Sequence, residues 1–95
     1  MPAVSRVGDI CTGEGCFPPR KSTSGSGDVT INGKAALRVG DAFEEHACGN
    51  SAHESALAEG SSTVFVNRLP LGRIGDPIAC GSAVAQGSTN VFAGG

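Results

Sequence analysis

The stretch GSGDVTINGKAALRVGD, residues 25–41, decides the fold, because related stretches occur elsewhere in the 95-residue chain. GSSTVFVNRLPLGRIGD, residues 60–76, matches it at seven of seventeen positions. A third copy, GSTNVFAGG, starts at residue 87 and stops halfway, and its missing half, VSRVGD, stands at residues 4–9. Self-similarity of this kind is the signature of a repeat architecture. Since the repeat is out of phase with the termini, we expect three units closed into a ring.

Each unit is expected to fold as two short β-strands joined by a turn. In the first unit Val29 and Ile31 alternate with Thr30, which is the period of a half-buried strand. Asn32-Gly33 follows, and this dipeptide favours a type I′ hairpin turn because both of its residues must adopt positive φ. The sequence therefore predicts a mostly β fold, made of three β-hairpin repeats with pseudo-threefold symmetry, in a single domain over residues 1–95.

Three segments depart from the simplest form of this pattern. In the second unit Asn67-Arg68 replaces Asn-Gly, so we expect a looser or longer turn there. In the third unit, residues 4–9 must pair with residues 89–93, which ties the two termini together. The segment HESALAE, residues 53–59, is where we expect a helical turn.

Composition sets limits on the class of protein. Gly, Ala and Ser fill 37 of the 95 positions, and Ile, Leu, Val and Phe together number 20. A core this small usually needs a metal, a disulfide or a partner chain to be stable. The net charge of −2 and the absence of Trp and Tyr argue against a nucleic-acid-binding protein. No apolar run approaches the roughly 20 residues of a membrane span.

The N-terminus predicts where the chain is made. Its first residues, MPAVSR, lack a basic flank followed by an apolar stretch, so we expect synthesis in the cytoplasm without a signal peptide. Four cysteines in such a chain favour metal binding or burial over a disulfide framework.

Both histidines and all four cysteines lie in the segments between the repeats, at residues 10–24, 42–59 and 77–86. If three hairpins form a three-sided body, these loops all leave from the same end. Their side chains then converge on one apex, as a tetrahedral zinc site requires. The sequence therefore predicts a zinc ion at this apex.

Position relative to the Asp of each repeat narrows the choice of ligands. His46 lies five residues after Asp41, and Cys80 lies four residues after Asp76. The expected ligands are His46, His53 and Cys80, with the fourth from Glu14, Cys16 or Cys11. Thiolate is the commoner fourth ligand in closed structural sites, although carboxylate is acceptable to zinc.

Other interpretations of the same residues remain open. Cys16 and Cys48 each lie seven residues after the Asp of their repeat, which indicates matched structural roles. Buried or paired cysteines are therefore the alternative to zinc. The aspartates that end the three repeats are more typical of turn caps than of a catalytic acid cluster, and the arginines before them of structural ion pairs. A cysteine nucleophile would need a substrate pocket for which this chain has little room, so we expect no enzyme.

Taken together, these motifs resemble the PAAR-repeat family, small cone-shaped proteins that cap the spikes of type VI secretion systems and contractile phage tails. The resemblance is carried by the three repeats, by CTGEGCFPPR at residues 11–20 and by GDPIACGS at residues 75–82. It implies three hairpin units forming a small cone, with zinc near the apex. Relatives commonly read TGHGC where this chain has TGEGC, so Glu14 replaces a family ligand histidine.

The resemblance also implies a function. The base of the cone would bind the end of a trimeric β-helical spike, with one tip per trimer, and sharpen it for membrane penetration. Such a tip is made in the bacterial cytoplasm, becomes part of a phage tail or a secreted spike, contacts the target membrane transiently, and can carry cargo effectors. The alternative from a different class is a free cytosolic zinc-binding interaction module.

Overall fold

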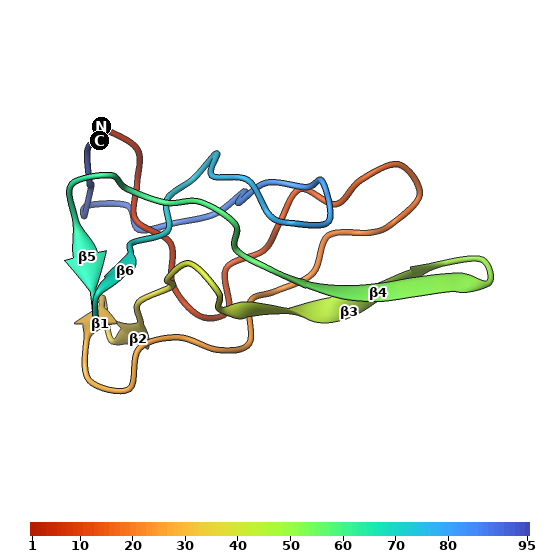
Figure 1. Cartoon of the computed structure of the whole chain (residues 1–95), viewed down its shortest axis with the longest axis horizontal. Coiled ribbons are helices and arrows are strands. Elements are labelled where there is room, and N and C mark those ends of the chain that lie inside the picture. Colours follow the sequence, from red (N-terminus) through yellow and green to blue (C-terminus); the bar gives the residue numbers. More distant parts are fainter.

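The computed structural model describes residues 1–95 and consists of strands, turns and irregular segments. It contains no helix, and hence none long and apolar enough to cross a membrane. The strands form three antiparallel hairpins, each a two-stranded sheet (Figure 1). Their bounds are β1 Thr30–Ile31, β2 Lys34–Ala35, β3 Ala42–Cys48, β4 Ser51–Ala56, β5 Phe65–Val66 and β6 Leu69–Pro70. The predicted mostly β fold is confirmed. Hairpins β1–β2 and β5–β6 belong to the first two repeats, whereas β3–β4 lies in the segment between them.

Backbone bridges between the repeats close the ring with pseudo-threefold symmetry. The arginine of each repeat pairs antiparallel with the residue two positions before the arginine of another. The three bridges are Arg6–Ala36, Arg38–Leu71 and Arg73–Val4. The two termini close the third repeat, because Ala3 pairs with Phe92 and the Val4 amide donates to the Val91 carbonyl at 2.9 Å. The two termini are thus tied together as expected, but the pairing involves only the start of the predicted segment: Arg6 pairs with Ala36, and the Val7 amide donates to the Ala35 carbonyl.

The Arg-x-Gly-Asp segments form one repeated structure. In the third repeat the Arg73 Nε and Nη2 groups donate to the two Asp76 carboxylate oxygens at 3.0 and 2.9 Å, and the Arg73 amide donates to Oδ2. The same three bonds recur in the other two repeats, at Arg6–Asp9 and Arg38–Asp41. Each guanidinium group thus binds both oxygens of its carboxylate. The hydrogen bond to Asp76 raises the pKa of Arg73 above its usual value. The aspartates are thus structural ion-pair partners and turn caps, as predicted.

The turn of the second hairpin corrects a prediction. Asn67-Arg68 is as tight as Asn32-Gly33, because Val66 pairs with Leu69 just as Ile31 pairs with Lys34. Both of its residues adopt the left-handed conformation, with φ of 53° at Asn67 and 67° at Arg68. The expectation of a looser turn was wrong because Arg68 accepts a conformation that glycine adopts without strain.

This turn offers a matched pair of substitutions. Arg68→Gly is expected to stabilise the fold by about 1 kcal/mol, because it relieves left-handed strain while adding some entropy to the unfolded chain. Gly33→Arg is expected to destabilise by a similar amount, since a side chain at Gly33 meets open space and only its φ of 81° opposes it. Urea unfolding measures both changes, and equal stability of all three proteins would show that these turns carry no strain.

The hairpin of β3 and β4 lies where the sequence predicted an irregular loop and a helical turn. Residues 53–59 are not helical; β4 runs to Ala56, and Leu57 then pairs with Ile78. A β-bulge between Phe43 and His46 hides the two-residue period of the strand. The register of the strand pair shifts there, and two exposed residues lie between the buried Phe43 and the buried His46. The helical prediction for 53–59 therefore failed because pairing with β3 outweighs local preference.

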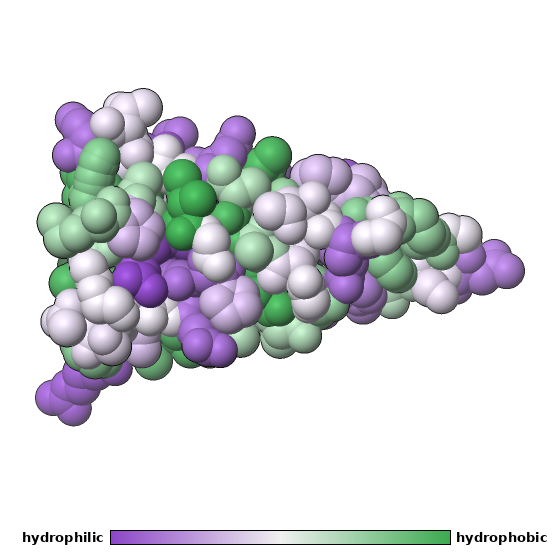
Figure 2. All heavy atoms as spheres, turned by 90° about the horizontal axis from the view of Figure 1, so that it is seen from above, coloured by the Kyte–Doolittle hydropathy of each residue, from purple (hydrophilic) through white to green (hydrophobic).

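The molecule tapers from a wide end to a narrow one, with extents of 38 × 24 × 22 Å (Figure 2). Hairpins β1–β2 and β5–β6 and both termini lie at the wide end, whereas the β3–β4 hairpin projects toward the narrow end (Figure 1). Two small clusters of buried side chains fill the interior. One consists of Cys11, Leu37, Phe43, Leu57, Ile78 and Val84, and the other of Val4, Ala36, Val66, Leu71 and Ala93. The cone shape is as expected.

Candidate metal centre

Four potential metal ligands from all three inter-repeat segments meet toward the narrow end. They are Glu14, His46, His53 and Cys80, and their ligand atoms lie within 4.8 Å of one another. His46 on β3 faces His53 on β4 directly across the strand pair, and their Nε2 atoms are 2.6 Å apart. The Glu14 Oε1 atom lies 3.0 Å from His53 Nε2 and 3.6 Å from His46 Nε2. The structure thus brings the three expected ligands, His46, His53 and Cys80, together with Glu14, one of the three candidates for the fourth.

The tautomer of His46 suits a metal ligand. Its Nδ1 atom lies 2.9 Å from the Pro18 carbonyl oxygen, and because a carbonyl only accepts, Nδ1 carries the proton. The neutral ring then has its lone pair on Nε2, the atom that faces Glu14 and His53. A hydrogen bond of this kind from the second ring nitrogen is the usual partner of a metal-binding histidine. His46 is also only 4 % exposed, so its orientation is well determined by packing.

A tight turn positions Glu14 against the histidines. We call residues 13–18 the apical turn; within it the Glu14 and Phe17 backbones exchange two hydrogen bonds, at 3.0 and 2.7 Å. Gly13 starts the turn at φ 73°, and a Cβ atom there would lie 2.6 Å from the Phe17 carbonyl oxygen, so only glycine fits. The Phe17 ring packs on both imidazoles, with centroids 5.0 Å from His46 and 4.3 Å from His53.

The charge of Glu14 is stabilised within this group. Hydrogen bonding by the Cys80 thiol is the main effect that holds the pKa of the Glu14 carboxyl below its usual value. Desolvation opposes it, and a hydrogen bond from His53 lowers the pKa further. Cys80 itself lies in a turn where its sulfur is 3.3 Å from the Ser82 hydroxyl. Glu14 is therefore ionised at neutral pH and ready to act as an anionic ligand.

The donor set fits a divalent metal such as zinc. Two imidazole nitrogens, one sulfur and one carboxylate oxygen are all common zinc ligands. A tetrahedral zinc ion with bonds of about 2.0–2.3 Å requires ligand atoms about 3.3–3.8 Å apart. The four atoms of this cluster already lie within 4.8 Å of one another, so small side-chain movements would bring them to that spacing.

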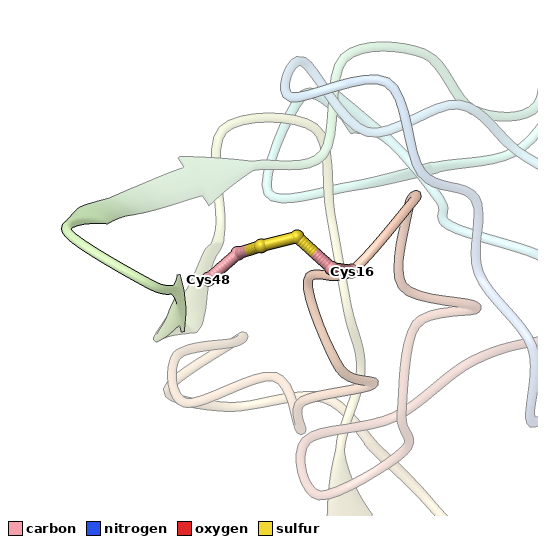
Figure 3. Close-up of a disulfide and its surroundings, with 2 residues drawn as sticks. All are labelled: Cys16 and Cys48. Atoms are coloured by element: carbon pink, nitrogen blue, oxygen red, sulfur yellow. A yellow bond between two sulfur atoms is a disulfide. The ribbon is translucent and has the colours of Figure 1, made fainter.

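The other two cysteines have different environments. Cys16 forms a disulfide with Cys48, with their Cα atoms 5.6 Å apart, so it is not available as the fourth ligand (Figure 3). Cys11 is buried in the hydrophobic cluster and lies outside the group of four. Of the three candidates for the fourth ligand, Glu14 is therefore the one that lies with His46, His53 and Cys80.

The pairing of Cys16 with Cys48 was not predicted, although their matched distances from the repeat aspartates were a signal. Gly49-Asn50, between the two histidines, was a second missed signal, because Gly-Asn is a dipeptide typical of two-residue hairpin turns. Recognising that hairpin would have placed His46 opposite His53 and Cys48 opposite Ser51, as the structure has them.

Comparison with known proteins agrees with this architecture. The family model described as the PAAR motif matches residues 18–86. The NAD(P)(+) glycohydrolase toxin Tse6 and the (p)ppApp synthetase toxin Tas1, from Pseudomonas aeruginosa strains PAO1 and UCBPP-PA14, are each 34 % identical over 77 residues. Each match covers 75 % of this chain and 18 % of the toxin. The double-stranded DNA deaminase toxin A of Burkholderia cenocepacia strain H111 is 32 % identical over 69 residues, which is 73 % of this chain and 5 % of that protein.

The fold and the four-residue cluster define a β-hairpin repeat protein of pseudo-threefold symmetry with a candidate metal centre at its narrow end. The chain belongs to the PAAR family, which is associated with the spike tips of type VI secretion systems and with effectors. It spans less than a fifth of the length of the toxins that it matches.

Proposed function

We propose that this chain is a structural tip that binds the blunt end of a trimeric β-helical spike, one tip per trimer, and sharpens it for membrane penetration. The observation that carries the proposal is the ring of three equivalent bridges. A body built this way presents a near-equivalent repeat to each of three identical partner chains: hairpin β1–β2, hairpin β5–β6 and the paired termini. An asymmetric fold could not do so.

The wide end has the character of a binding surface. Large apolar side chains are exposed on and beside the hairpins and termini found there. We call this group the base surface, and it consists of Met1, Val64, Phe65, Leu69 and Phe92. Phe65 is 54 % exposed and Phe92 is 44 % exposed. Exposed aromatic side chains on so small a protein typically mark an interface, so the base surface is the proposed contact with the spike.

The narrow end is proposed to hold one zinc ion through Glu14, His46, His53 and Cys80. A metal bound there supplies cross-links between all three inter-repeat segments, and this stabilises a chain with two small apolar clusters. Four protein ligands fill a tetrahedral zinc site and leave no open position for the water that catalytic zinc needs. We therefore propose a structural metal and no enzymatic activity in this single domain.

The setting follows from the family. We propose that the chain is made in the bacterial cytoplasm, is assembled on a spike of a secretion machine or a phage tail, and contacts the target membrane transiently during delivery. Because the similar proteins are toxins, we propose cargo effectors as further partners. The alternative, a free cytosolic zinc-binding module, would have no use for a threefold base.

A mixing experiment tests the proposed contact. The purified chain and a trimeric β-helical spike fragment are expected to elute together from a size-exclusion column. Phe65→Glu is expected to weaken the complex at least about tenfold, because it places a charge in an apolar contact. Glu45→Gln, an exposed position on β3 away from the wide end, is the control and should bind like the unmodified chain. Binding by the Phe65→Glu variant at full strength would assign the contact to another surface.

A further inference from the structure

The Cys16–Cys48 disulfide joins the two parts that carry the metal ligands. Cys16 lies in the apical turn, two residues from Glu14, and Cys48 ends β3, two residues after His46 (Figure 3). Since residues two apart on a strand point to the same face, Cys48 and His46 share one side of the hairpin. The disulfide is therefore the covalent link next to the candidate metal centre.

The apical turn has few other attachments to the hairpin. Backbone hydrogen bonds join the first inter-repeat segment to β3 at Lys21 and Thr23, beyond the turn, where Glu44 donates to Lys21 and Thr23 donates to Ala42. Within residues 13–18, the hydrogen bonds to the hairpin are those that involve the histidine rings, at Pro18 and Glu14. Without the disulfide, the same contacts that orient the ligands would also have to hold the turn in place.

We propose that Cys16 and Cys48 form a redox switch that sets the affinity of the metal centre, an inference that rests on the zinc site of the proposed function. As a disulfide the pair holds Glu14, Phe17 and Pro18 against the histidines. As two thiols it releases the turn, so that forming the centre requires ordering the turn as well. The oxidised protein therefore binds zinc more tightly than the reduced protein.

The redox step is ordinary thiol–disulfide exchange. The Cys16 and Cys48 thiols lose two protons and two electrons as their sulfurs bond, and a disulfide oxidant such as oxidised glutathione is reduced to two thiols. Cytosolic thiols stay reduced and disulfides persist in oxidising compartments. The centre would thus be weak where the chain is made and tight once the tip has reached an oxidising environment.

Binding and redox state must influence each other equally, because linkage is reciprocal. If the disulfide strengthens zinc binding tenfold, saturating zinc makes the disulfide harder to reduce by the same factor, which corresponds to about 30 mV for a two-electron couple. This second effect can be measured on the unmodified protein.

The test compares the zinc affinity of the oxidised protein, the protein reduced with a phosphine, and the variant Cys16→Ser/Cys48→Ser, by competition with a chromophoric chelator. We expect the oxidised protein to bind zinc about 10–100-fold more tightly than the variant, the range typical of lost supports around metal ligands. The reduced protein should bind zinc with the affinity of the variant. A higher affinity of the reduced protein would show that its free thiols bind the metal themselves.

A glutathione redox titration with and without zinc gives the readout that needs no variant, in case the double substitution prevents folding. We expect zinc to lower the midpoint potential of the pair. Equal zinc affinity of the oxidised protein and the variant, with an unshifted midpoint, would overturn the switch but leave the zinc centre standing. Absence of zinc binding in every form would overturn the zinc centre and the switch together.

Discussion

Replacing His46 by alanine is expected to lower zinc affinity by more than about a hundredfold and to remove most of the stability that the metal supplies. His46 is the most buried of the four residues, and its Nδ1 hydrogen bond to the Pro18 carbonyl orients its Nε2 atom toward the other ligands, so alanine removes a well-oriented ligand atom. Zinc at a hundred times its dissociation constant stabilises the folded state by about 2.7 kcal/mol. Thermal unfolding with zinc and with a chelator measures this contribution directly.

Melting both proteins with zinc and with chelator separates the stability supplied by the metal from that supplied by the His46 side chain. The unmodified protein should melt at a much lower temperature in chelator, whereas His46→Ala should melt at nearly the same temperature in both conditions. Glu54→Gln, an exposed position beside His53 on β4, is the control and should retain the full response to zinc. A His46→Ala protein that zinc stabilises as much as the unmodified protein would exclude His46 from the centre.

Leu37→Ala is expected to lower the free energy of unfolding by about 2–5 kcal/mol, because it removes a large side chain that is fully buried and leaves a cavity. A 95-residue protein has a total stability of about 5–14 kcal/mol, so this is a large fraction of the whole. Leu37 lies in the cluster that contains Leu57, and the packing is tight: a Cβ atom on Gly72 would lie 2.7 Å from Leu57 and 3.2 Å from Leu37.

Leu69→Ala provides the matched control for this substitution. The same side chain is removed, but Leu69 is 37 % exposed on β6, so we expect a loss below about 1 kcal/mol. Urea unfolding of both variants in saturating zinc gives the two values. Losses of equal size would mean that the interior does not depend on the small cluster around Leu37.

The repeats could be predicted from the sequence because each one carries its structure locally. The same Arg-x-Gly-Asp ion pair forms in every unit. In all three units the serine near the start of the repeat accepts a hydrogen bond from the amide three residues later, at 2.9–3.0 Å. Repetition also showed that the ring is cut within one unit. Three cluster residues, His46, His53 and Cys80, could be named because they lie in segments that leave the same end of the ring, whereas Glu14 was one of three candidates for the fourth ligand.

The β3–β4 hairpin and the disulfide could not be predicted in the same way. The bulge between Phe43 and His46 breaks the two-residue period, so the strand is visible only from its pairing with β4. Pairing of Cys16 with Cys48 depends on how the apical turn approaches the end of β3, across 32 residues of sequence. Likewise, the left-handed φ at Arg68 follows from the closure of its hairpin and not from an intrinsic preference of arginine.

Native mass spectrometry of the tip mixed with a trimeric spike fragment measures whether one pseudo-threefold, zinc-bound tip caps one trimeric spike. We expect a dominant complex whose mass equals three spike chains, one tip and one zinc ion, and which Phe65→Glu disrupts. A complex with three tips per trimer, or a tip that stays free of the spike at micromolar concentrations, would contradict the proposed function.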